Sequence, residues 1–239
     1  MPVDIVMYHY VRDNELHEFN TYCRRKSEFE AQIDFFKKHS QIINPLDFEE
    51  INFYLKEKHK RAYLLTFDDG YVDHFYCANY LSSNNVSAYF FPPINSINGD
   101  LLDVNAIHLL IGNNKIKIKD LFEYIILLCA ENDFEFNFNK RKLKIKSYLN
   151  QFKCEETRYD DKETLIIKRI LQRDLIDHKN RRFILDKLLK EFIGKSPKTL
   201  SKQIYLDVRK MNIMKDLGMI FGSHGNSHRW LNTLSYDEQ

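Results

Sequence analysis

The apolar run at residues 62–67 (AYLLTF) passes directly into an Asp-Asp-Gly turn at residues 68–70. A short apolar run that ends in turn residues predicts a buried strand of a sheet. Other short apolar runs lie at residues 4–10, 87–91 and 219–222, and helical patterns separate them. Strands that alternate with helices in this way predict a parallel α/β sheet or barrel.

Stretches with apolar residues at helical spacing lie between these strands, at residues 27–39, 45–58, 71–82 and 205–218. Ser27 is the expected N-cap of the first helix, because Glu30 follows three residues later as in a capping box. Gly218 is expected to end the last helix. Over the first 91 residues the predicted order is therefore strand, helix, helix, strand, helix, strand.

The composition changes between about residues 98 and 203, where Lys, Leu and Ile are frequent and most of the pattern is helical. Helices are expected there at residues 121–129, 140–149, 162–174 and 181–192, and residues 133–139 alternate as a short strand does. We therefore expect an α/β core made of residues 1–97 and 204–239. Residues 98–203 are expected to be a large, mostly helical insertion.

Charge and hydropathy argue against two broad classes of partner. The chain has 36 Lys and Arg residues against 34 Asp and Glu residues, which gives a formal net charge of +2. This charge balance does not indicate nucleic acid as a partner, because such a partner would favour a strongly basic face. Its apolar runs are far shorter than the ~20 residues that a membrane span needs. The first residues lack the basic region of a secretory signal, so we expect a cytoplasmic protein.

Two adjacent carboxylates, Asp68 and Asp69, follow the strongest predicted strand. Two such charges at a strand end are costly unless a positive group holds them, and a divalent cation would do so. Neighbouring side chains on an extended backbone point in opposite directions. One Asp can therefore bind a metal while the other faces a water molecule, although an ordinary turn is the plainer alternative.

Two histidines, His224 and His228, follow the last predicted strand. Histidines four residues apart meet on one helical turn or in a tight loop and can share a metal, although two surface histidines are the plainer alternative. The carboxyl ends of parallel strands share one mouth, where active sites lie. Two histidines and one carboxylate there match a catalytic zinc site with positions open for water and substrate.

The two motifs, TFDDGY at residues 66–71 and SHGNSH at residues 223–228, resemble those of the polysaccharide deacetylase family. This family is also called the NodB-homology or carbohydrate esterase family 4 group, and its pattern is TFDDG followed by H-(S/T)-x-x-H. The resemblance covers roughly residues 2–95 and 204–239. It implies a distorted or incomplete (β/α) barrel of the NodB type, interrupted by the helical insertion.

The resemblance also implies an activity and a set of site residues. The activity is metal-dependent hydrolysis of an N- or O-linked acetyl group on a carbohydrate or glycan precursor. By motif position, Asp69, His224 and His228 would bind a divalent metal, usually Zn²⁺. Asp68 would be the general base that takes a proton from the attacking water.

The chain departs from the family pattern in three ways. Gly225 stands where the family favours Ser or Thr, and about 100 residues are inserted after the strand at residues 87–91. The family's later motifs, which supply an Arg, an Asp that orients the base and a late His that acts as acid, do not follow His228. We therefore expect a fragment of a longer protein, or a natural truncation with reduced or no activity.

Three further residues, His9, Tyr71 and Trp230, are candidates for lining the substrate site, although each also fits a place in the core. Two other functions stay open. One is hydrolysis of an amide in a small non-sugar substrate, and the other is glycan binding without catalysis. The expected partner is an acetylated sugar or glycan, and a cytoplasmic sugar intermediate suits the absence of a secretion signal better than a wall polymer.

Overall fold

The computed structural model describes residues 3–13, 23–57, 61–152, 160–175, 177–229, 231 and 234–239. The chain divides into two compact units. Unit 1 comprises Met1–His17, Tyr22–Asp100 and Leu200–Arg229, and unit 2 comprises Glu18–Thr21, Leu101–Thr199 and Trp230–Gln239. The predicted division of the chain at residues 97 and 203 remains a prediction.

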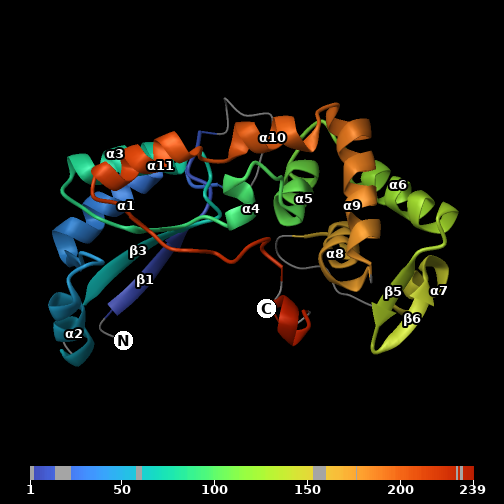
Figure 1. Ribbon diagram of the computed structural model, residues 1–239, viewed down its shortest axis with the longest axis horizontal. Coiled ribbons are helices and arrows are strands. Elements are labelled where there is room, and N and C mark those ends of the chain that lie inside the picture. Colours follow the sequence, from blue (N-terminus) through green and yellow to red (C-terminus); the bar gives the residue numbers. More distant parts are fainter. Residues whose placement is uncertain are drawn as a thin grey trace. The chain divides into compact units, whose positions relative to one another are not determined.

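Unit 1 contains a five-stranded sheet in which every described pairing is parallel. Its strands are β1 (Val3–Tyr8), β2 (Gln41–Ile42), β3 (Ala62–Asp68), β4 (Tyr89–Phe91) and β7 (Ile220–Phe221). The order across the sheet is β1-β3-β4-β7, and β2 pairs with the first residues of β3. The paired strands β1 and β3 lie side by side in Figure 1. A mixed α/β fold with a parallel sheet is therefore confirmed.

An aromatic core covers one face of this sheet. Phe67 pairs in register with Tyr8 on one side and with Phe90 on the other, and Phe90 pairs with Phe221. The rings of Phe67 and Phe90 stack at 4.5 Å. The helices α1 (Lys26–His39), α3 (His74–Ser83) and α11 (Val208–Asp216) lie along this face (Figure 1).

The opposite face of the sheet carries Ile5 and Met7, which are 66% and 57% exposed. Parallel sheets are usually covered on both faces. The described strands form an open path from β1 to β7, and the distorted or incomplete (β/α) barrel that the resemblance implies remains a prediction.

The first helix does not begin where the sequence pattern places it. Helix α1 starts at Lys26 with Arg25 as its N-cap, and Glu28 Oε2 accepts a hydrogen bond from the Arg25 backbone N–H at 2.9 Å. The prediction of Ser27 as N-cap is therefore wrong by two residues, because Glu28 and not Glu30 reaches back to the cap. The remaining helices of this part are α2 (Phe48–Lys56) and α4 (Ile94–Ile97), together with the residues of α10 (Pro197–Ile204) from Leu200 onward.

Unit 2 is mostly helical. Its helices are α5 (Asp103–Ile111), α6 (Ile118–Glu131), α7 (Ile145–Gln151), α8 (Lys162–Arg169) and α9 (His178–Leu188), with π-helical turns at Ile170–Asp174 and Leu189–Ile193 and a 3₁₀ turn at Tyr236–Glu238. An antiparallel hairpin joins β5 (Glu135–Phe138) to β6 (Arg141–Lys144). Tyr148 is fully buried here, and its hydroxyl donates to Asp174 Oδ2 at 2.8 Å.

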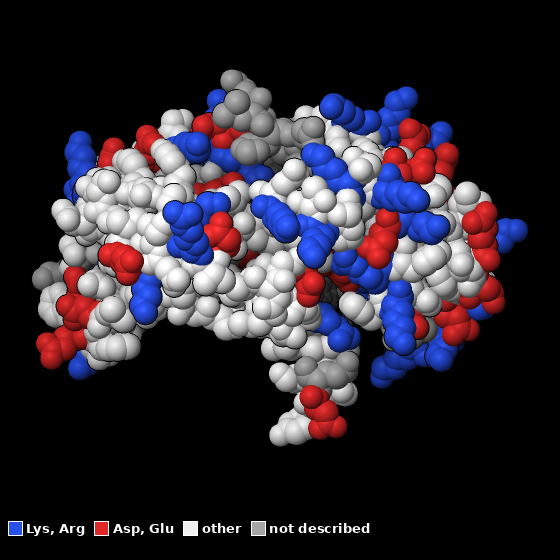
Figure 2. Space-filling view, turned by 45° about the horizontal axis from the view of Figure 1, so that its top comes forward, with Lys and Arg blue, Asp and Glu red and all other residues white. Residues whose placement is uncertain are grey.

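Basic and acidic side chains lie interspersed on the face that Figure 2 shows. Several of them form ion pairs, such as Lys168 with Asp160 at 2.7 Å and Arg182 with Asp186 at 3.1 Å. Within the part of the chain that the structure describes, none of the helices has both the length and the apolar surface for crossing a bilayer.

Candidate metal centre

The turn after β3 adopts an uncommon backbone conformation. Asp69 and Gly70 both have positive φ values, 72° and 67°. A side chain at Gly70 would place its Cβ 2.7 Å from the Cβ of Pro92, so glycine alone fits without a shift. The backbone N–H of Asp69 donates to the Phe91 carbonyl at 3.1 Å. Left-handed backbone at a residue other than glycine is strained, and such strain is concentrated at functional sites.

The histidine loop follows β7 and is anchored to the start of α4 by backbone hydrogen bonds. Ile94 N donates to Gly225 O at 3.1 Å, and Asn95 N donates to Asn226 O at 2.9 Å. Gly225 has a φ of 71°. Glycine adopts this left-handed backbone conformation at a lower cost in free energy than Ser or Thr does. The glycine at this departure from the family pattern therefore suits the observed loop. His228 has a φ of 56° and is, after Asp69, the second residue of the site other than glycine with left-handed backbone.

These two loops bring Asp69, His224 and His228 together. Asp69 Oδ1 lies 3.2 Å from His228 Nε2 and 3.7 Å from His224 Nε2. One possible donor atom from each of the three residues lies within 4.8 Å of the other two. The Asp69 side chain is only 4% exposed, while the two histidine side chains are 25% and 34% exposed. A carboxylate at the bottom and two imidazoles toward the surface thus form one cluster.

The two Asp69–histidine donor distances fit a small divalent cation. Zinc bonds of about 2.0–2.1 Å at a tetrahedral angle place two donors about 3.3 Å apart. The two Asp69–histidine distances, 3.2 and 3.7 Å, bracket this value. Asp69 Oδ1 is buried and faces the Nε2 atoms of His228 and His224. A buried carboxylate oxygen in that state calls for a positive partner.

Mutual interactions shift the pKa values of two members of the cluster. Burial acts to raise the pKa of Asp69, but hydrogen bonds from His228 and Tyr71 outweigh it and lower the pKa to about 2. The hydrogen bond to Asp69 raises the pKa of His228. Without a metal, His228 therefore tends to hold a proton opposite a charged Asp69, and a bound cation would take the place of that proton.

Asp68 lies beside this cluster but has a different environment. It is the last residue of β3, opposite Phe91 of β4, and strand alternation places it on the face away from the Phe67 ring. Asp68 is 9% exposed. Burial raises its pKa, while the nearby charges of His224 and His9 act in the opposite direction.

The residues predicted to line a substrate site lie in different surroundings. Tyr71 is fully buried, and its hydroxyl donates to Asp69 Oδ2 at 2.7 Å. His9 is half-buried, and its backbone carbonyl accepts a hydrogen bond from the His74 ring at 2.7 Å. Burial lowers the pKa of His74 to about 4, so its ring is neutral. Trp230 lies outside the described residues. The lining role of His9, Tyr71 and Trp230 remains a prediction, although Tyr71 has no exposed surface here.

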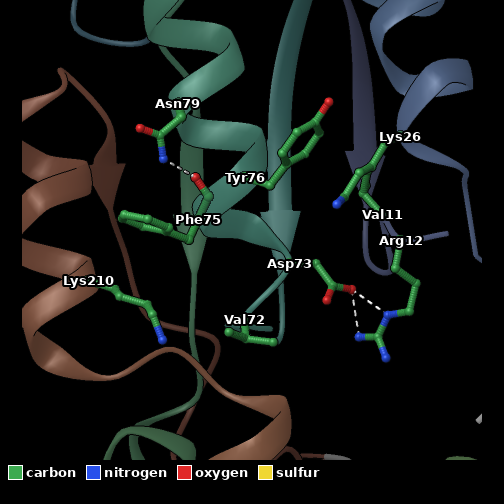
Figure 3. A pocket seen from close by; sticks show the side chains of 9 residues that line it. All are labelled: Val11, Arg12, Lys26, Val72, Asp73, Phe75, Tyr76, Asn79 and Lys210. Atoms are coloured by element: carbon green, nitrogen blue, oxygen red, sulfur yellow. Dashed lines mark hydrogen bonds and ion pairs between the residues drawn. The ribbon is translucent and has the colours of Figure 1, made fainter. Parts of the chain in front are cut away.

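The structure also contains a buried ion pair between Arg12 and Asp73, which the sequence pattern does not predict. Both Nε and Nη2 of Arg12 lie 2.6 Å from Asp73 Oδ2, and each side chain is 5% exposed (Figure 3). The pair ties the segment after β1 to the start of α3. It borders a pocket of about 510 Å³ whose walls include Tyr76 and Lys210. No motif joins Arg12 to Asp73, so the sequence alone gave no signal for it.

Comparisons with protein-family models and with curated proteins give no match. Among solved structures, the chain is similar to a de-N-acetylase from Aggregatibacter actinomycetemcomitans, with a TM-score of 0.36 and 15% identity over 97% of this chain and 99% of that chain. At so low a TM-score the likeness carries no weight for the fold or the activity of this chain. The site is therefore judged by its own geometry.

Proposed function

We propose that the chain is a divalent-metal-dependent hydrolase that removes an N- or O-linked acetyl group from a carbohydrate or glycan precursor. The observation that carries the proposal is the cluster of Asp69, His224 and His228, whose donor atoms lie within 4.8 Å of one another. The acetyl substrate is supported by the resemblance of the two motifs to those of polysaccharide deacetylases.

The donor set favours zinc as the cation. Two imidazole nitrogens and one carboxylate oxygen are the ligands of several catalytic zinc sites, which keep a position open for water. A bound divalent ion supplies Lewis acidity, which lowers the pKa of water and polarises a carbonyl group. Asp69 would hold the cation through its buried carboxylate, and His224 and His228 would hold it through their more exposed rings.

Asp68 is assigned as the general base. It is the last residue of β3, next to Asp69, and the charges of both histidines of the cluster act to lower its pKa. In the proposed reaction, Asp68 accepts a proton from the water whose oxygen attacks the acetyl carbonyl carbon. The bond from that carbon to the sugar nitrogen or oxygen then breaks, and the leaving nitrogen or oxygen takes up the proton that Asp68 accepted. The products are acetate and a free amine or hydroxyl group.

An acetate-release assay tests this function. The zinc-loaded chain should release acetate from N-acetylated or O-acetylated sugars. Asp68→Asn should keep the metal but lose about 10²–10⁴-fold in turnover, since it removes the base and leaves the ligands in place. Asp186→Asn, which makes the same chemical change at a half-exposed side chain in unit 2, should act as wild type.

The other outcomes separate the competing functions. Bound metal without acetate release from any substrate would favour a glycan-binding protein that does not catalyse. Activity confined to small non-sugar amides would favour an amide hydrolase. Full activity in Asp68→Asn would refute the assignment of the base.

A further inference from the structure

The two oxygens of the Asp69 carboxylate have different partners. Oδ1 faces His224 and His228, at 3.7 and 3.2 Å from their Nε2 atoms. Oδ2 accepts a hydrogen bond from the Tyr71 hydroxyl at 2.7 Å. The carboxylate thus presents one oxygen to the candidate metal position, and its second oxygen is held by a neutral donor.

The ring of Tyr71 is held from several sides. It is fully buried, stacks on Tyr10 with centroids 4.2 Å apart, and meets the edge of the His74 ring at 5.7 Å. The backbone around it is tied as well, since Leu206 N donates to Gly70 O at 2.9 Å. The position of the hydroxyl is therefore set by packing and by the neighbouring backbone, and does not depend on the carboxylate alone.

The Tyr71 hydroxyl keeps Asp69 Oδ2 engaged as a hydrogen-bond acceptor, because the packing around the buried ring prevents it from turning away. Hydrogen bonds of this kind to a ligand carboxylate orient it and commonly change metal affinity about 10–100-fold when removed.

The number of oxygens that a carboxylate gives to a metal has a direct consequence for catalysis. A catalytic zinc site has three protein ligands and keeps the fourth position for water or substrate. If Asp69 bound through both oxygens, the second would occupy space that water and substrate need. A carboxylate limited to one oxygen leaves that space open.

We propose that Tyr71 is a positioning residue that makes Asp69 a one-oxygen metal ligand and so keeps a coordination position open. The inference rests on the proposed function, because it needs a metal at the Asp69, His224 and His228 cluster. Its role is exerted through Asp69 and does not require contact between Tyr71 and the substrate.

Tyr71→Phe tests this role because it keeps the ring and its stacking on Tyr10 and removes only the hydroxyl. The chain offers a matched control in Tyr148→Phe. Tyr148 is also fully buried, and its hydroxyl donates to Asp174 Oδ2 at 2.8 Å, in unit 2. Both variants lose one buried tyrosine–aspartate hydrogen bond, so both are expected to lose similar stability. Only Tyr71→Phe should change the metal site.

The measurements are calorimetric titration with Zn²⁺ and the visible absorption of the Co²⁺-substituted chain. We expect Tyr71→Phe to weaken zinc binding about 10–100-fold and to reduce the Co²⁺ absorption, because a two-oxygen carboxylate raises the coordination number. Tyr148→Phe should match wild type in both measurements. Unchanged zinc affinity together with an unchanged Co²⁺ spectrum in Tyr71→Phe would overturn the proposal.

Two further readouts keep the test decisive. If wild type binds no zinc, the proposed metal site itself fails, which is a different result from equal binding by wild type and Tyr71→Phe. If Tyr71→Phe does not fold, the zinc-loaded crystal structure of wild type decides. It should show Asp69 bound through Oδ1 alone, with Oδ2 on Tyr71, and a carboxylate bound through both oxygens would overturn the proposal.

Discussion

Replacing Arg12 with methionine should cost unit 1 a large part of its stability. Arg12 Nε and Nη2 both lie 2.6 Å from Asp73 Oδ2, and each side chain is only 5% exposed. Arg12→Met keeps an apolar chain of similar length but leaves the Asp73 carboxylate buried without its guanidinium. Breaking a buried pair in this way typically costs about 3–5 kcal/mol. At about 2–4 °C per kcal/mol for a chain of this size, the melting temperature should fall by about 6–20 °C.

The assay is thermal and urea unfolding followed by circular dichroism, with two comparison variants. Arg61→Met removes an exposed pair, in which Arg61 Nε lies 3.2 Å from Asp4 Oδ2 and the side chains are 67% and 42% exposed. It should cost at most about 1 kcal/mol. The double variant Arg12→Met with Asp73→Leu should be more stable than Arg12→Met alone, because it removes the buried charge as well.

The reasoning is refuted if Arg12→Met costs no more than Arg61→Met. It is equally refuted if the added Asp73→Leu change makes Arg12→Met less stable. Either result would mean that the desolvated carboxylate of Asp73 is not the source of the cost.

The remaining predictions concern the N-cap of α11, the helix that precedes β7 and the histidine loop. Asp207 Oδ1 accepts a hydrogen bond from Lys210 N at 2.7 Å, so Asp207→Ala should lower the free energy of unfolding by about 0.5–2 kcal/mol at pH 7, while Asp207→Asn retains most of it. The same hydrogen bond lowers the pKa of Asp207, so its contribution is complete above the unfolded pKa of about 3.9 and is lost as the pH falls through the folded value. The difference between wild type and Asp207→Ala in urea unfolding should therefore shrink below about pH 4. A difference that stays constant from pH 7 to pH 3 would contradict this account.

Four of the five strands of the α/β unit were predictable because each is a short apolar run, whereas the two-residue strand β2 (Gln41–Ile42) was missed. The run at residues 62–67 corresponds to β3 (Ala62–Asp68), and residues 219–222 enclose β7 (Ile220–Phe221). Helix boundaries were less accurate. The helix predicted from residue 71 begins at His74, because Tyr71 and the two residues after it form a turn that contacts Asp69 and Arg12.

Unit 2 contains a segment in which the local sequence pattern predicts the wrong secondary structure. Residues 140–149 have helical spacing, yet Arg141–Lys144 is strand β6 and only the residues from Ile145 form helix α7. Asn139 and Lys140 both have positive φ values, 51° and 65°, as the two-residue turn of a hairpin requires. Pairing with β5 therefore overrides the helical pattern, and the turn residues give little sign of it, because Lys rarely adopts this conformation.

The candidate site was predictable to the level of its motifs. Asp69, His224 and His228 lie far apart in sequence, and the rule that parallel strands end at one edge predicted that they meet, as they do. Their roles as metal ligands, and that of Asp68 as base, remain proposals. The Tyr71 hydrogen bond could not be predicted, because it depends on the left-handed backbone at Asp69.

Zinc titration of wild type and His228→Ala tests the central claim most directly. His228 Nε2 lies 3.2 Å from Asp69 Oδ1, and its removal leaves two of the three proposed ligands. His178→Ala, which removes a half-exposed histidine of unit 2, serves as the control. The account predicts one Zn²⁺ per chain for wild type and His178→Ala, and loss of binding for His228→Ala. Unchanged zinc stoichiometry and affinity in His228→Ala would contradict it.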